Sequence, residues 1–282
     1  MADKAILYDA TRCTACRGCQ AACKQWNEND EYIPPPTDEK GVQAKNQGSY
    51  ENPPDLSPKT WLKMEFRELE SGGKIRWLFS RRACMHCTDA ACVRVCPNGT
   101  LYHHESGIVA YNKDTCTGCG YCIDACPYHV PRSTRNIITG IAKMDKCTFC
   151  TTAGFDRIGA GYEPACVKTC PPKALTFGDR KTLVDEGKKR VQALKAKGYN
   201  NAYLYGENEL NGLHVIYVLE DKPEVYGLPV NPQVPVTAIA WKSVLQPVGW
   251  ALGGLTILGL GLNYLVAREA KMTRELPPKK EK

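Results

Sequence analysis

The sequence has few of the residue patterns that carry substrate chemistry. Only five histidines occur among its 282 residues. No serine or cysteine is placed with a histidine as a nucleophile and its base would be, apart from cysteines whose position is better explained by metal binding. No glycine-rich loop follows a strand, as a phosphate-binding loop would. The sequence therefore shows no visible site for nucleophilic catalysis or for a nucleotide.

Cysteine is absent from residues 171–282, whereas the preceding part of the chain holds 16 cysteines in four groups of four. A disulfide framework has no reason to form such tight, repeated groups. Groups one and two are Cys13, Cys16, Cys19, Cys23 and Cys84, Cys87, Cys92, Cys96. Groups three and four are Cys116, Cys119, Cys122, Cys126 and Cys147, Cys150, Cys166, Cys170. This grouping indicates thiolates that bind metal.

The spacing of the cysteines favours [4Fe–4S] clusters. Groups one and three read C-x2-C-x2-C-x3-C, the run of bacterial ferredoxins, although group one lacks the following proline. The first three thiolates of such a run can reach three corners of one cube. The fourth cysteine lies on the departing helix and ligates the other cluster in two-cluster ferredoxins. Cys23 is therefore expected to serve a different site from the rest of group one. Zinc also uses C-x2-C pairs, but as two pairs.

A repeat within the chain predicts the fold class. Tyr8 precedes Cys13 by the same step by which Tyr111 precedes Cys116, and both tyrosines end short apolar runs typical of strands. The succession of strand, cysteine loop and helix predicts an α+β protein with two ferredoxin-like dicluster modules. We also expect a surface loop at residues 27–60, a β-hairpin at 61–79, a helix at 182–197 and a strand at 213–219.

The formal net charge of +7 invites a nucleic-acid partner, but it omits the metal sites. Each oxidised [4Fe–4S] core with four thiolates carries roughly −2, so four of them bring the chain close to neutral. No basic stretch in the body is interleaved with aromatic residues. We therefore expect no nucleic-acid partner.

A C-terminal stretch predicts one transmembrane helix. Residues 243–267 contain no charged residue and, as a helix, would extend about 37 Å against a hydrocarbon core of about 30 Å. Trp241 and Tyr264 fall near its two ends, where aromatic anchors are favoured. Gly249 and Gly253 form a G-x-x-x-G face, which is either a surface for packing on another helix or incidental.

The basic residues after this stretch predict its orientation. Six lysines and arginines follow it against three glutamates, so the tail, residues 268–282, is expected in the cytoplasm. The cluster-bearing body would then be periplasmic, with the chain a single-pass protein of the inner membrane. The start, MADKAILYDATRC, holds no signal peptide and no twin arginine, so we expect export in a complex with a partner that carries one. A body that stays inside is the alternative.

The order of the four groups resembles the iron–sulfur subunits of molybdopterin oxidoreductases, and most of all the β subunit of membrane-bound formate dehydrogenase. The resemblance is carried by RCTACRGCQAACKQW, YENPPDLS, CTGCGYCIDACPYHVPR, EPACVKTCP and the single membrane span. It implies a non-catalytic electron-transfer subunit with four [4Fe–4S] clusters. Its partners would be a formate-oxidising molybdenum or tungsten catalytic subunit, a membrane cytochrome b that passes electrons to quinone, and membrane lipid.

The resemblance also implies how the groups pair, which spacing alone leaves open. In one module Cys13, Cys16 and Cys19 would act with Cys170, and Cys147, Cys150 and Cys166 with Cys23. In the other module Cys84, Cys87 and Cys92 would act with Cys126, and Cys116, Cys119 and Cys122 with Cys96. The first module would lie near the catalytic subunit and the second toward the cytochrome b. His86 and His129, beside the cysteine groups, would either tune a cluster potential or only pack.

The expected domain boundaries follow from these assignments. They are 1–80 for the first part of module A with its hairpin insertion, 81–144 for module B, 145–240 for the remainder of module A with a C-terminal extension, 241–267 for the transmembrane helix and 268–282 for the cytoplasmic tail. Two other functions remain open: the equivalent subunit of a hydrogenase, a polysulfide reductase or a related molybdoenzyme, and a membrane anchor whose clusters only hold the fold.

Overall fold

The computed structural model describes residues 3–29, 51, 53–71, 73–135, 140, 142–151, 155–240 and 244–275. The chain forms two compact units, Met1–Pro235 and Val236–Lys282. All 16 cysteines belong to the first unit. Most of the expected surface loop, Trp241 and the last basic residues of the tail lie outside the described residues.

A four-stranded sheet forms one end of the first unit. Its order is β8 (Leu175–Asp179), β1 (Lys4–Asp9), β10 (Val215–Leu219) and β9 (Tyr203–Tyr205). β1 and β10 are parallel, and the outer pairs are antiparallel. Successive side chains of a strand point to opposite faces, and both faces of these two central strands are buried.

The two faces of the sheet meet different neighbours. On one face Leu7, Ile216 and Val218 pack against α5 (Arg180–Ala196), which confirms the helix expected near residues 182–197. On the other face Tyr8 and Tyr217 join the core that contains most of the cysteines. The sheet therefore separates a structural helix from the cysteine-rich interior.

A long hairpin, β2 (Leu62–Ser71) and β3 (Lys74–Ala83), confirms the expectation for residues 61–79. The outer end is exposed, with Ile75 66% and Trp77 47% accessible. The inner end is buried and inserts Met64 and Arg81 into the core of the unit. The hairpin thus reaches from the surface to the cysteine groups.

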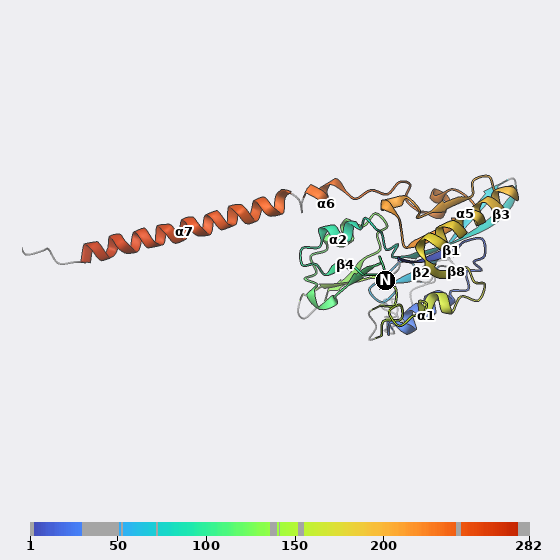
Figure 1. Ribbon diagram of the computed structural model, residues 1–282, viewed down its shortest axis with the longest axis horizontal. Coiled ribbons are helices and arrows are strands. Elements are labelled where there is room, and N and C mark those ends of the chain that lie inside the picture. The colour runs from blue at the N-terminus through green and yellow to red at the C-terminus, as the bar shows by residue number, and fades with distance from the viewer. Residues whose placement is uncertain are drawn as a thin grey trace, which may run out of the picture. The chain divides into compact units, whose positions relative to one another are not determined.

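Short elements surround the cysteines. Two further strand pairs are β4 (Leu101–His103) with β5 (Val109–Tyr111), and β6 (Arg132–Arg135) with β7 (Ala142–Asp145). The helices are α1 (Gly18–Trp26), α2 (Ala91–Val95), α3 (Tyr121–Asp124) and α4 (Ala165–Lys168), and the 3-10 turns are η1 (Lys113–Thr115), η2 (Glu209–Asn211) and η3 (Pro223–Tyr226). α1 packs with α4, and α2 packs with α3. Figure 1 shows α2 and β4 on one side of the unit and β1, β8 and α1 on the other.

The described part of the second unit contains α6 (Val236–Ala240) and α7 (Gln246–Glu275). Residues 246–271 are long and apolar enough to cross a membrane, and their large side chains are exposed, for example Leu255 at 65% and Ile257 at 72%. The expected span is therefore helical, and its uncovered apolar surface indicates association with a membrane. The helix continues to Glu275 because residues 268–275 are mostly strong helix formers.

Candidate functional site

Four cavities in the first unit are each lined by four cysteines. Three cysteines of each quartet come from one group and the fourth from another. Cavity 1 is lined by Cys13, Cys16, Cys19 and Cys170, and cavity 2 by Cys147, Cys150, Cys166 and Cys23. Cavity 3 is lined by Cys84, Cys87, Cys92 and Cys126, and cavity 4 by Cys116, Cys119, Cys122 and Cys96. The structure thus brings together the same quartets that the resemblance implies.

The cavities are small and similar in size, at about 20, 10, 20 and 20 Å³ for cavities 1 to 4. A single zinc ion holds its sulfur ligands at about 2.3 Å and would draw four of them together around it. Among the described residues, no three Cys, His, Asp or Glu side chains converge closely enough to hold one metal ion, so the thiols of each quartet lie further apart than in a zinc site. Four thiols arranged in this way fit a group larger than one ion, as a [4Fe–4S] core is.

The loops that carry the cysteines follow the same backbone path in groups one and three. Gly118 and Gly120 have φ of +73° and +81°, and the equivalent Ala15 and Arg17 have φ of +52° and +61°. Residues other than glycine seldom adopt such backbone angles. Positive φ values at matching positions of the two loops support the internal repeat. Each loop then enters a short helix, α1 or α3, that contains the last residues of its group or leads to them.

The fourth cysteine reaches the neighbouring cavity because the short helices are paired. α1 packs against α4, so Cys23, which is buried on α1, lies near the thiols of Cys147, Cys150 and Cys166. Burial, and then these three thiols, raise the pKa of Cys23 well above its usual value. The expectation that Cys23 is separated from the other three cysteines of group one agrees with this geometry.

Burial governs the chemistry of the thiols. It raises the pKa of Cys19, Cys122 and Cys150 to about 12 and that of Cys84 to about 11. At these pKa values the thiols stay protonated near pH 7. A metal ligand must be a thiolate, so bound iron would take the place of these protons and would supply the compensating positive charge.

Several N–H groups point at the cysteine sulfurs. The backbone N–H of Ala15 donates to Sγ of Cys13 at 3.4 Å, and that of Met144 donates to Sγ of Cys116 at 3.5 Å. Nδ2 of Asn27 donates to Sγ of Cys23 at 3.6 Å. Such bonds orient sulfur ligands and tune the potential of a cluster.

Neighbouring cavities lie close together, because thiols of one influence the pKa of thiols in the next. After burial, Cys166 of cavity 2 is the strongest influence raising the pKa of Cys19 in cavity 1. Cys147 of cavity 2 contributes to raising the pKa of Cys84 in cavity 3. Cys122 of cavity 4 contributes to raising that of Cys92 in cavity 3. These influences indicate three neighbouring pairs: cavities 1 and 2, cavities 2 and 3, and cavities 3 and 4.

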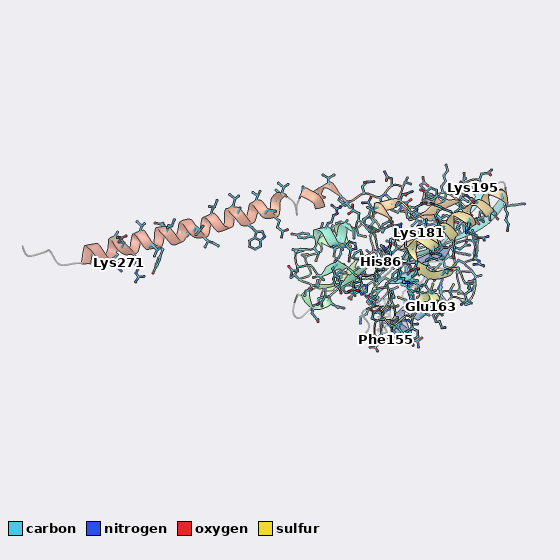
Figure 2. The ribbon with its side chains drawn as sticks, viewed as in Figure 1. His86, Phe155, Glu163, Lys181, Lys195 and Lys271 are labelled. Carbon is cyan, nitrogen blue, oxygen red and sulfur yellow. The ribbon has the colours of Figure 1, made fainter. Side chains whose placement is uncertain are left out.

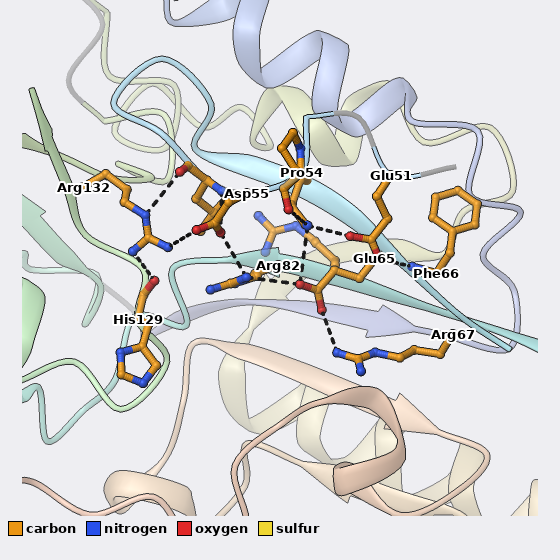
Figure 3. Close-up of polar contacts among 12 residues, drawn as sticks. Glu51, Pro54, Asp55, Glu65, Phe66, Arg67, Arg82, His129 and Arg132 are labelled. Carbon is orange, nitrogen blue, oxygen red and sulfur yellow. Dashed lines mark hydrogen bonds and ion pairs between the residues drawn. The ribbon is translucent and has the colours of Figure 1, made fainter. Parts of the chain in front are cut away.

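A polar network ties the hairpin to the loops around it (Figure 3). Nη2 of Arg132 donates to Oδ2 of Asp55 at 2.8 Å, and Nη1 of Arg82 lies 3.1 Å from Oδ1 of the same carboxylate. Arg82 also pairs with Glu65 at 3.4 Å. Asp55 belongs to the NPPDLS stretch, so these contacts join that stretch to β3 and to the start of β6.

The histidines beside the cysteine groups differ in their surroundings. His86 is fully buried in the first unit, where it is labelled in Figure 2, and its Nδ1 accepts a hydrogen bond from the Val109 N–H at 3.2 Å. Burial, followed by the positive charge of Lys146, holds the pKa of His86 well below its usual value, so its ring is neutral. His129 is exposed. Its carbonyl accepts a hydrogen bond from Arg132, and its backbone N–H donates to the carbonyl of Cys126.

Two buried cations were not singled out in the sequence. Arg81 and Lys146 are each 1% exposed, and both lie among the cysteines. A signal for them exists, because they stand three residues and one residue before the first cysteine of groups two and four. Basic residues there are ambiguous in a sequence, since only the fold decides whether a long cation is buried or reaches solvent.

Comparisons with known proteins agree with the geometry. The family model for a 4Fe-4S dicluster domain matches residues 75–180. The nitrate-inducible formate dehydrogenase iron-sulfur subunit of Escherichia coli (strain K12) is 40% identical over 268 residues, which cover 94% of this chain and 85% of the relative. The formate dehydrogenase-O iron-sulfur subunit of the same organism is 41% identical over 248 residues, 86% of this chain and 77% of the relative.

A more distant relative carries another name. The hydrogenase-2 operon protein HybA of Escherichia coli O157:H7 is 31% identical over 293 residues, covering 90% of this chain and 83% of the relative. The two formate dehydrogenase subunits are more similar to this chain, and they share most of its length. Together with the cysteine quartets, they show that the chain carries [4Fe–4S] clusters and belongs to the family of formate dehydrogenase iron–sulfur subunits.

Proposed function

We propose that this chain conducts electrons from a formate-oxidising molybdenum or tungsten subunit to a membrane cytochrome b and quinone, through four [4Fe–4S] clusters. The observation that carries the proposal is the set of four neighbouring cavities, each lined by four cysteines. Cavities 1 and 2 would form one dicluster module, and cavities 3 and 4 the other. The role in electron transfer is supported by the 4Fe-4S dicluster family model and by the similarity to formate dehydrogenase iron–sulfur subunits.

The residues of each quartet would hold one cluster, which supplies one-electron oxidation and reduction when bound. Each cysteine group would provide the fourth ligand of the neighbouring cluster, so the two clusters would belong to one module. Tyr8 and Met64 line cavity 1 and Arg81 lines cavity 2, so the sheet and the inner end of the hairpin shield part of both cavities from water, while Cys16 at cavity 1 stays exposed. Shielding from water favours fast electron transfer between neighbouring clusters, because fewer water molecules must reorient when a cluster changes its charge.

The second unit supports a membrane partner. Within the described part of its own unit, no residue buries the apolar stretch of α7, and Gly249 and Gly253 offer small residues for close packing on a helix of a cytochrome b subunit. Arg268 and Lys271 follow the apolar stretch, and Lys271 is labelled in Figure 2. We infer a cytoplasmic C-terminus from these cations, and hence a periplasmic cluster-bearing unit.

A second candidate function is electron transfer in a hydrogenase complex. It is favoured by the similarity to the hydrogenase-2 operon protein over 90% of this chain. The substrate is chosen by another chain in either case, so the two functions differ only in the donor that reduces the clusters.

The test is anaerobic reduction of the complex purified in mild detergent. We expect formate to reduce the clusters within the turnover time of the catalytic subunit, followed by loss of absorbance near 400 nm and by electron paramagnetic resonance. Hydrogen gas should leave them oxidised. Reduction by hydrogen and not by formate would assign the chain to a hydrogenase, and reduction by neither would favour a structural role for the clusters.

A further inference from the structure

Two cations are buried in the first unit without a carboxylate partner among the described residues. Arg81 and Lys146 are both 1% exposed. Nε and Nη1 of Arg81 have no hydrogen-bond partner, and Nζ of Lys146 donates only to carbonyls, of Val109 at 2.6 Å and Cys147 at 3.0 Å. A buried charge is normally paired, because leaving water costs several kcal/mol. Their counter-charge must therefore come from something other than Asp or Glu.

Arg81 lies between cavities 1 and 2. It stands on β3, opposite Met64 of β2, and its side chain lines cavity 2 while Met64 lines cavity 1. Its positive charge lowers the pKa of Cys19 in cavity 1 and of Cys166 in cavity 2, against the larger effect of burial in both. The inner end of the hairpin thus delivers one unpaired cation to the junction of these two sites.

Lys146 holds the equivalent place between cavities 2 and 3. It lines cavity 3, and its Nζ is bonded to the carbonyl of Cys147, which lines cavity 2. Its charge lowers the pKa of Cys84 and Cys92 in cavity 3, again against the larger effect of burial. Cavity 2 is therefore flanked by a buried cation on each side.

A third buried cation shows the ordinary arrangement. Lys63, on β2 of the same hairpin, is 2% exposed, but its Nζ lies 2.7 Å from Oε2 of Glu51 and 3.8 Å from Oε1 of Glu65. Two glutamates cancel its charge.

Arg81 and Lys146 have no such carboxylate partners among the described residues. Arg81 lies beside Tyr217 and the thiols of cavities 1 and 2. Nζ of Lys146 lies 5.4 Å from the centre of the Tyr111 ring and next to the thiols of cavity 3. These thiols become anionic cluster ligands of about −2 per site.

We propose that Arg81 and Lys146 set the reduction potentials of the clusters on either side of them by supplying fixed positive charge at the two junctions. This rests on the four-cluster assignment of the proposed function. Adding an electron makes a cluster more negative, so a nearby cation favours reduction. Each cation stabilises an electron on two sites, and cavity 2, between both, gains from the two together.

The proposal predicts a pattern across the four potentials. Removing the charge of Arg81 lowers the potentials of the clusters in cavities 1 and 2. Removing that of Lys146 lowers those in cavities 2 and 3. The two variants thus share one affected cluster, and the cluster in cavity 4 is unaffected in both because Coulomb interactions weaken with distance.

The experiment is a redox titration of the purified full-length complex, monitored by electron paramagnetic resonance, with iron counted in each sample. The neutral variants are Arg81→Met and Lys146→Met. The matched controls, Arg81→Lys and Lys146→Arg, keep the charge, and Lys181→Met removes an exposed one from α5. We expect each neutral variant to shift two one-electron equilibria by at least tenfold, or about 59 mV, toward the oxidised form, with all controls close to wild type.

Several outcomes overturn the proposal. Unchanged potentials in neutral variants with full iron would show that the charges do not act on the clusters. Equal shifts in the charge-preserving variants would assign the effect to packing. If Arg81→Met lacks iron, Arg81→Gln carries the same test, and loss of iron in both would give the residue a role in cluster assembly instead. Wild-type protein with fewer than four clusters would refute the proposed function itself, which is a separate result.

Discussion

Lys63→Met probes the buried contacts that hold the hairpin against the cysteine sites. Nζ of Lys63 donates to Oε2 of Glu51 at 2.7 Å and to the carbonyl of Pro54 at 2.5 Å. Removing one member of a buried ion pair costs about 3–5 kcal/mol, because the other charge is left unpaired. Glu51 keeps 21% of its surface exposed and a hydrogen bond from the Phe66 N–H at 2.9 Å. We therefore expect the lower end of the range, about 3 kcal/mol.

That loss should lower the melting temperature of the cluster-bearing unit by roughly 6–12 °C, at about 2–4 °C per kcal/mol for a unit of this size. The assay is anaerobic melting at one fixed scan rate, followed by the cluster absorbance, because iron–sulfur proteins unfold irreversibly. Lys181→Met, at an exposed position, is the control. The double variant Lys63→Met/Glu51→Leu should recover much of the loss, since it removes the stranded charge as well. A single variant that melts within 2 °C of wild type, or a double variant no better than the single, would refute this reasoning.

Three further outcomes are expected. Cys96→Ser should alter the cluster of cavity 4 and leave that of cavity 3 intact, and a spectrum that matches Cys84→Ser instead would contradict the crossed arrangement. Ending the chain after Pro235 should preserve the reduction of a dye by formate, because the removed unit holds no cysteine. It should abolish the reduction of quinone, because the helix proposed to pack on the cytochrome b is removed. Equal loss of both activities would instead assign the second unit a role in assembly or export. Partial burial raises the pKa of Glu51, but bonds from Lys63 and the Phe66 N–H outweigh it and hold the pKa below its usual value. Its stabilisation is therefore complete above the usual pKa of about 4.3 and is lost as the pH falls through the lowered value, so wild type should lose melting temperature more steeply than Glu51→Gln on acidification.

The cysteine spacing predicted much of the site because cluster ligation imposes a local geometry. A run such as Cys116 to Cys126 must turn tightly and then enter a helix. Both features depend on residues that are close together in the sequence, so the local sequence predicts them. The hairpin and α5 were predictable for the same reason, since alternation and amphipathic periodicity are local patterns. The separation of Cys23 from its own group followed from one helix and its direction.

Long-range features were not predictable from local pattern. The parallel pairing of β1 with β10 places Ile6 beside Val215, and the sequence of neither strand predicts which strand it pairs with. Side chains around Arg81 alternate between the two faces of β3, as in any strand. The burial of Arg81 depends on the inner end of the hairpin packing against cavities 1 and 2, which the local sequence does not show. Which cavities are neighbours likewise depends on packing between distant segments of the chain, which spacing within a group does not encode.

Iron and acid-labile sulfide per chain, measured on the purified holoprotein, test the four-cluster assignment most directly. Four complete quartets should bind about 16 iron and about 16 sulfide, four of each per cluster. Iron near 12, or zinc in stoichiometric amount, would contradict the assignment of one [4Fe–4S] cluster to each cavity.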